Sequence, residues 1–113
     1  MTTVKFALDD CGKVTGFAVS GHSGYSEEGS DIVCAAVSAS VQMLEQQIAQ
    51  VIGEEKASFE VAGDAEISYK IPDLTGEDLF AVTNMVDGFM RFMQSVSKHY
   101  KDYLTLKMEV KKC

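Results

Sequence analysis

A histidine and a cysteine twelve positions apart are the residues of this chain best suited to nucleophilic chemistry. His22 lies in the segment Gly-His-Ser-Gly-Tyr at 21–25, and Cys34 follows after a short acidic loop. A cysteine thiolate is a strong nucleophile, and an imidazole within reach can take the thiol proton and later protonate a leaving group. The spacing alone leaves a second interpretation open, in which Cys34 packs in a core and His22 is an ordinary exposed loop residue.

The residues around Cys34 predict a helix over 31–52. Its apolar residues recur at intervals of three and four: Val33, Val37, Val41, Leu44, Ile48 and Ile52. Asp31 or Ser30 is a suitable N-cap for this helix. With Asp31 as the cap, Cys34 is the third helical residue, where free N–H groups and the helix dipole favour a thiolate. It lies about 60° from the apolar face, on the edge of that face, and Ser38 lies one turn further along the same edge.

The neighbours of the pair also have purely structural interpretations. Asp31 is most simply a helix cap, and Ser38 is a small residue that permits close packing. Glycines at 21, 24 and 29 allow tight turns or close approach to a ligand, so the loop can bring His22 back toward Cys34.

The rest of the chain predicts one domain over 1–113 with the order β-β-α-β-β-α-β. Alternating apolar residues over 4–8 and 14–20 flank an Asp-Asp-Cys-Gly turn and predict a hairpin. A second hairpin is expected over 59–71 across Gly63-Asp64, and a last strand over 104–110. Between them a second helix is expected over 76–100, with an apolar face made of Leu79, Val82, Val86, Phe89, Met93, Val96 and Tyr100. The fold class is α+β, in two layers: a mostly antiparallel or mixed sheet with both helices on one face.

The composition restricts the partners and the cofactors. A net charge of −7, with seventeen acidic and ten basic residues, argues against direct nucleic-acid binding and favours a basic substrate. No C-x-x-C pair is present, so neither a zinc ribbon nor a thioredoxin-type redox motif is expected, and Cys11 and Cys113 are expected to be incidental surface thiols. Without a membrane-spanning run or a secretory signal, the chain is expected to be cytoplasmic. Met85, Met90 and Phe92 widen the apolar surface of the second helix, which indicates either core packing or a dimer contact.

The segment 21–38 closely resembles the signature of the ribosomal-processing cysteine protease family called Prp. That signature is Gly-His-x-Gly-Tyr, a short loop, and then Asp-Ile-Val-Cys-Ala-Ala-Val-Ser, which this chain carries at 31–38. The resemblance implies a cytoplasmic bacterial endopeptidase that removes the N-terminal extension of a large-subunit ribosomal protein. It also implies a homodimer without a cofactor. By position, Cys34 would be the nucleophile and His22 its general base and acid, while Gly21, Asp31 and Ser38 would support or orient the site.

Two other classes of function remain open beside the protease. A ribosome-associated adaptor without enzymatic activity would bind a basic protein tail through the acidic loop, and it would be indifferent to Cys34→Ser. A thiol-based redox or metal sensor would use Cys34 and His22, and it would show bound metal or reversible oxidation without peptidase activity.

Overall fold

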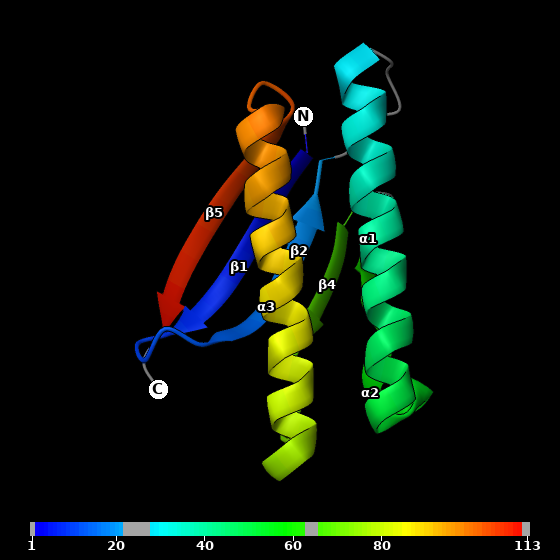
Figure 1. Cartoon of the computed structure of the whole chain (residues 1–113), viewed down its shortest axis with the longest axis vertical. Helices are drawn as coiled ribbons and strands as arrows, with labels where there is room; N and C mark the ends of the chain where they lie inside the picture. Colours follow the sequence, from blue (N-terminus) through cyan, green and yellow to red (C-terminus); the bar gives the residue numbers. More distant parts are fainter. Residues whose placement is uncertain (1, 22–27, 63–65, 112–113) are drawn as a thin grey trace.

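The structure, a computed structural model, describes residues 2–21, 28–62 and 66–111. In chain order its elements are β1 (Thr2–Asp9), β2 (Val14–Ser20), α1 (Glu28–Ile52), α2 (Glu54–Ala57), β3 (Glu60–Ala62), β4 (Glu66–Lys70), α3 (Gly76–His99) and β5 (Leu104–Lys111). Figure 1 shows the two long helices side by side on one face of a single sheet. The predicted α+β fold with two layers is therefore confirmed.

The five strands form a mixed sheet in the order β3-β4-β2-β1-β5. The two hairpins, β1–β2 and β3–β4, are antiparallel, and β2 joins them by pairing antiparallel with β4. The last strand, β5, returns to the first and pairs parallel with β1, so Thr2 lies opposite Leu104. This long-range pairing fixes the beginning of the chain inside the sheet.

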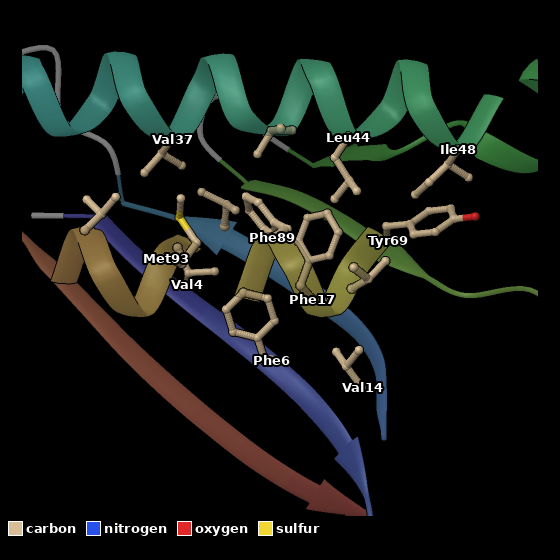
Figure 2. Close-up of a cluster of buried hydrophobic side chains, with 14 of the residues drawn as sticks. Val4, Phe6, Val14, Phe17, Val37, Leu44, Ile48, Tyr69, Phe89 and Met93 are labelled. Atoms are coloured by element: carbon tan, nitrogen blue, oxygen red, sulfur yellow. The ribbon is translucent and has the colours of Figure 1, made fainter. Parts of the chain in front are cut away.

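The hydrophobic core lies between the sheet and the two helices. Figure 2 shows side chains of α1, α3 and the sheet meeting there, and the buried residues of α1 are Val33, Val37, Val41, Leu44 and Ile48. From α3 come Val82, Val86, Phe89, Met93 and Val96. Both sets match the faces that the helical periodicity predicts.

An aromatic cluster centred on Phe17 of β2 joins the layers. Its ring centroid lies 4.9 Å from that of Phe89 on α3 and 5.4 Å from that of Phe59, which precedes β3. Tyr69 of β4 packs on Phe59 at 4.7 Å, and its hydroxyl donates a 2.9 Å hydrogen bond to the carbonyl of Lys56. These contacts hold β2, the strand that leads toward the Gly-His segment, against α3 and against the segment that follows α2.

The structure corrects three expectations about the elements. First, α1 begins at Glu28 rather than at 31, so Ser30 and Asp31 lie inside the helix and neither is its N-cap. Second, Gly53 ends α1 as expected, with a φ of 89°, but the one-turn helix α2 follows it at once. Third, Tyr100 and Leu79 were expected on the buried face of α3; Tyr100 lies just beyond the helix and Leu79 is partly exposed. The turn at Gly63-Asp64 lies outside the described residues.

No helix among the described residues is long and apolar enough to cross a membrane.

Candidate active site

Cys34 lies on α1 at the edge of the buried face, as its helical phase predicts. Its neighbour Val33 is fully buried, whereas Cys34 itself is half-buried. A thiol at this boundary is accessible from solvent on one side and packed on the other. The predicted position within the helix is wrong, however, because α1 starts at Glu28 and Cys34 is its seventh residue rather than its third.

This shift changes the electrostatics expected at the thiol. The N–H groups without an intrahelical partner belong to the first four residues of a helix, and the dipole acts mainly within the first turn. Cys34 stands in the second turn, so its own amide is not one of the free donors.

The packed side of the thiol faces a cavity of about 20 Å³ between α1 and one end of the sheet. Thr2 at the start of β1, Val19 near the end of β2 and Ile67 of β4 form its sheet side. Val37, Ser38 and Val41 complete it from α1. A volume of this size holds about one water molecule. None of these described lining residues carries a charge.

Among the described residues on the sheet side of the cavity, Thr2 is the polar neighbour of the Cys34 sulfur. The hydroxyl Oγ1 of Thr2 lies 3.7 Å from Sγ of Cys34, within hydrogen-bond distance for sulfur. Sequence reasoning missed this residue. The signal was present, because Thr2 continues the alternation of Val4 and Phe6 and so belongs on the buried face of β1.

The other predicted site residues divide into those that the structure describes and those that it does not. Ser38 is exposed and lines the same cavity as Cys34, so the structure brings these two together. Gly21 directly follows β2 with a φ of 76°, a conformation that favours glycine. His22 lies outside the described residues, and its contact with Cys34 remains a prediction. The backbone of Asp31 belongs to α1.

Among the described residues, neither Cys11 nor the acidic side chains form an alternative centre. Cys11 is exposed, as expected of an incidental surface thiol, and Cys113 lies outside the described residues. Across residues 2–21, 28–62 and 66–111, no three His, Cys, Asp or Glu side chains are grouped to hold a metal ion. A larger groove of about 1150 Å³ runs between the β1–β2 turn and the start of α3, but its lining includes neither Cys34 nor Thr2.

Comparison with known proteins gives a consistent picture. The family model described as "Cysteine protease Prp" matches residues 1–105. A comparison with curated proteins found no match.

Solved structures share the fold over nearly the whole chain. SMU.848 from Streptococcus mutans is 20% identical with a TM-score of 0.77, covering 98% of this chain and 96% of that one. The essential ribosomal processing protease Prp from S. aureus, in complex with a covalently linked product peptide, is 22% identical with a TM-score of 0.75. That match covers 96% of this chain and 100% of the other. The same S. aureus protease with a substrate peptide gives a TM-score of 0.66 at 18% identity, with the same coverage.

Proposed function

This chain belongs to the cysteine protease Prp family and is therefore a cysteine protease, and we propose that it removes the N-terminal extension of a large-subunit ribosomal protein. The observation that carries the proposal is the half-buried thiol of Cys34 beside a small cavity at one end of the sheet. The S. aureus protein of the same fold is a ribosomal processing protease with a covalently linked product peptide, which supports covalent catalysis here.

In the proposed mechanism, Cys34 is the nucleophile and His22 is the general base and acid. His22 takes the thiol proton, and the sulfur attacks the scissile carbonyl carbon to form a tetrahedral intermediate. Collapse of the intermediate breaks the C–N bond, and His22 returns the proton to the leaving amine. Water, deprotonated by His22, then attacks the thioester, which releases the extension as a carboxylic acid and restores the thiol.

The end of β2 supports the pairing of these two residues. Val19 of β2 lines the cavity beside Cys34, and Gly21, two positions after Val19, directly follows the strand. The chain therefore leaves the sheet at the same end as the thiol, one residue before His22 (Figure 1). The left-handed backbone at Gly21 turns the chain at this point, which gives that glycine its supporting role.

Ser38 and Asp31 have supporting roles in the proposal. Ser38 lies one helical turn after Cys34 and lines the same cavity, so it would shape the space beside the thiol. Asp31 lies within α1, which begins at Glu28, and we propose that its carboxylate orients His22. Such a carboxylate holds an imidazole in the tautomer that can accept the thiol proton.

The charge of the chain fits a basic protein substrate. Its net charge of −7 attracts a positively charged chain and repels the phosphate backbone of nucleic acid. Acyl transfer by a thiol and an imidazole requires neither a metal nor a cofactor. We place the enzyme in the cytoplasm, where such a substrate is synthesised.

The proposal includes a homodimer through α3. Phe80 and Phe92 of this helix are 72% and 48% exposed, which is unusual for large aromatic side chains. Sedimentation of the wild type and of the Phe80→Ser and Phe92→Ser variants tests the idea. We expect a dimer that at least one substitution weakens, whereas a wild type that is monomeric at all concentrations overturns this part of the proposal.

The function itself is tested with an extended ribosomal protein as substrate. The wild type is expected to cut once within the N-terminal region, at a position that mass spectrometry maps. The Cys34→Ser variant should bind the substrate without cutting it, and His22→Ala should cut far more slowly. An adaptor would bind without cutting even as the wild type, and that result would contradict the proposal.

A further inference from the structure

Among the described residues, Thr2 is the polar side chain that is buried with the hydrophobic core. Only 2% of its surface is exposed, and its Oγ1 lies 3.7 Å from Sγ of Cys34. Burying a hydroxyl costs free energy unless the hydroxyl is hydrogen-bonded, so the hydrogen-bond partner of Thr2 explains its burial. The partner of this hydroxyl is the thiol of the proposed nucleophile.

The backbone around Thr2 is held firmly despite its place at the start of β1. Its amide donates a 3.0 Å hydrogen bond to the carbonyl of Tyr103, and Thr2 pairs with Leu104 of β5. Tyr103 and Leu104 in turn both donate to the carbonyl of Tyr100 at the end of α3. The backbone of Thr2 is therefore fixed relative to β5 and to the end of α3.

Apart from Ser38 of α1, the other residues that line the cavity beside the sulfur are apolar. Val19, Val37, Val41 and Ile67 line the cavity with Thr2, Cys34 and Ser38. Apolar neighbours disfavour a thiolate. A hydroxyl that donates to the ionised sulfur counters this effect, since a hydrogen bond to a charged acceptor is stronger than one between neutral groups.

We propose that Thr2 is a positioning residue for the nucleophile: its hydroxyl donates a hydrogen bond to the thiolate of Cys34 and holds Sγ at the boundary of the core. While Cys34 is neutral, either group can be the donor. Once the thiol has lost its proton, only the hydroxyl can donate. Thr2 keeps its proton throughout the reaction. The catalytic part of this inference rests on the proposed function of Cys34.

Three variants separate the hydroxyl from its packing. Thr2→Val removes the hydroxyl and keeps the shape of the side chain, whereas Thr2→Ser keeps the hydroxyl and removes a methyl group. Thr3→Val is the matched control, because Thr3 is the next residue of β1 and its side chain points to the opposite face of the sheet. Circular dichroism establishes that each variant is folded.

The first readout is the rate of Cys34 alkylation by iodoacetamide against pH, followed by mass spectrometry of the Cys34 peptide so that Cys11 and Cys113 do not contribute. We expect Thr2→Val to move the midpoint of the curve of alkylation rate against pH upward by about one pH unit. Near neutral pH this shift corresponds to a tenfold lower rate of alkylation. Thr2→Ser and Thr3→Val should keep the wild-type midpoint. An unchanged midpoint in Thr2→Val, or an equal shift in Thr2→Ser, overturns the proposal. If Thr2→Val does not fold, the alkylation midpoints of Thr2→Ala and Thr2→Ser are compared instead, since only the serine variant keeps the hydroxyl.

The second readout is cleavage of the ribosomal protein substrate. A positioning role predicts that Thr2→Val lowers kcat about tenfold with little change in KM, and that Thr2→Ser restores it. Alkylation requires no protease activity, so its rate tests the contact between Thr2 and Cys34 even if the substrate is not cut. A wild type that alkylates as expected but does not cleave would refute the proposed function and leave the thiol–hydroxyl contact established.

Discussion

Gly16 of β2 lies so close to the backbone of Tyr69 in β4 that a β-carbon at position 16 would be 2.6 Å from the Tyr69 carbonyl oxygen. The register of β1 and β2 shifts at this point, since Ala7 pairs with Gly16 but Leu8 pairs with Val14. The extra residue, Thr15, uses its carbonyl to accept a hydrogen bond from the amide of Ile71. A glycine is therefore needed where the bulge meets the neighbouring strand.

Gly16→Ala is accordingly expected to destabilise the fold by about 1–3 kcal/mol, because a backbone atom must move to admit the methyl group. Gly88→Ala is the matched control. Gly88 is an exposed residue in the middle of α3, and an added β-carbon there would have nothing within 4 Å. That substitution should stabilise the protein by about 0.5–1 kcal/mol. Urea denaturation measures both, and equal effects of the two substitutions would contradict the close contact at Gly16.

The hydroxyl of Tyr69 gives a second prediction, on stability against pH. Burial raises the pKa of Tyr69 above its ordinary value of 10.0. The folded state therefore holds the phenol proton more tightly than the unfolded state does. Protonated Tyr69 therefore contributes fully to the free energy of unfolding below pH 10. This contribution is lost as the pH rises through the folded-state pKa.

Tyr69→Phe removes both this pH dependence and the hydrogen bond to Lys56. Below pH 10, the variant should be about 1 kcal/mol less stable than the wild type, because the Lys56 carbonyl loses a donor. The difference should shrink as the pH rises above 10. Denaturation curves of both proteins at pH 8 and at pH 11 test this. A stability difference that grows with pH would contradict a raised pKa of Tyr69.

The charge of the enzyme predicts the effect of salt on cleavage. Attraction between the acidic enzyme and a basic substrate weakens as the Debye length falls from about 10 Å at 0.1 M salt to about 3 Å at 1 M. We expect kcat/KM for the ribosomal protein to fall about tenfold over this range, with kcat nearly constant. A short uncharged peptide carrying the cut site is the control. Equal salt dependence for both substrates would exclude electrostatic attraction as the cause.

Local patterns in the sequence predicted most of the fold. The period of the apolar residues identified the long helices, and alternation around Asp9–Gly12 and Gly63–Asp64 identified the two hairpins. The short helix α2 was missed because Glu54–Ala57 has one buried residue, Ala57, and no period to detect. The start of α1 was misplaced because Glu28, Gly29 and Ser30 are polar or small and extend no apolar face.

The candidate site was only partly predictable, since it depends on contacts between distant residues. Helical phase placed Cys34 at the edge of the core, and the family signature supplied His22 as its partner. The contact between Thr2 and Cys34 spans 32 positions and exists because β5 pairs parallel with β1 and fixes Thr2 in the sheet. Alternation along β1 places Thr2 on the buried face, but no local pattern shows that it meets Cys34 there.

The central claim is that the sulfur of Cys34 attacks the substrate, and trapping the covalent intermediate tests it most directly. The enzyme is mixed with an extended ribosomal protein, quenched in acid within the first turnover, and measured intact by mass spectrometry. The account predicts an added mass equal to the N-terminal extension, held as a thioester and located at Cys34 by peptide mapping. It also predicts that Cys34→Ala neither forms the adduct nor cuts the substrate. An adduct on another residue, or cleavage by Cys34→Ala at the wild-type rate, would contradict the account.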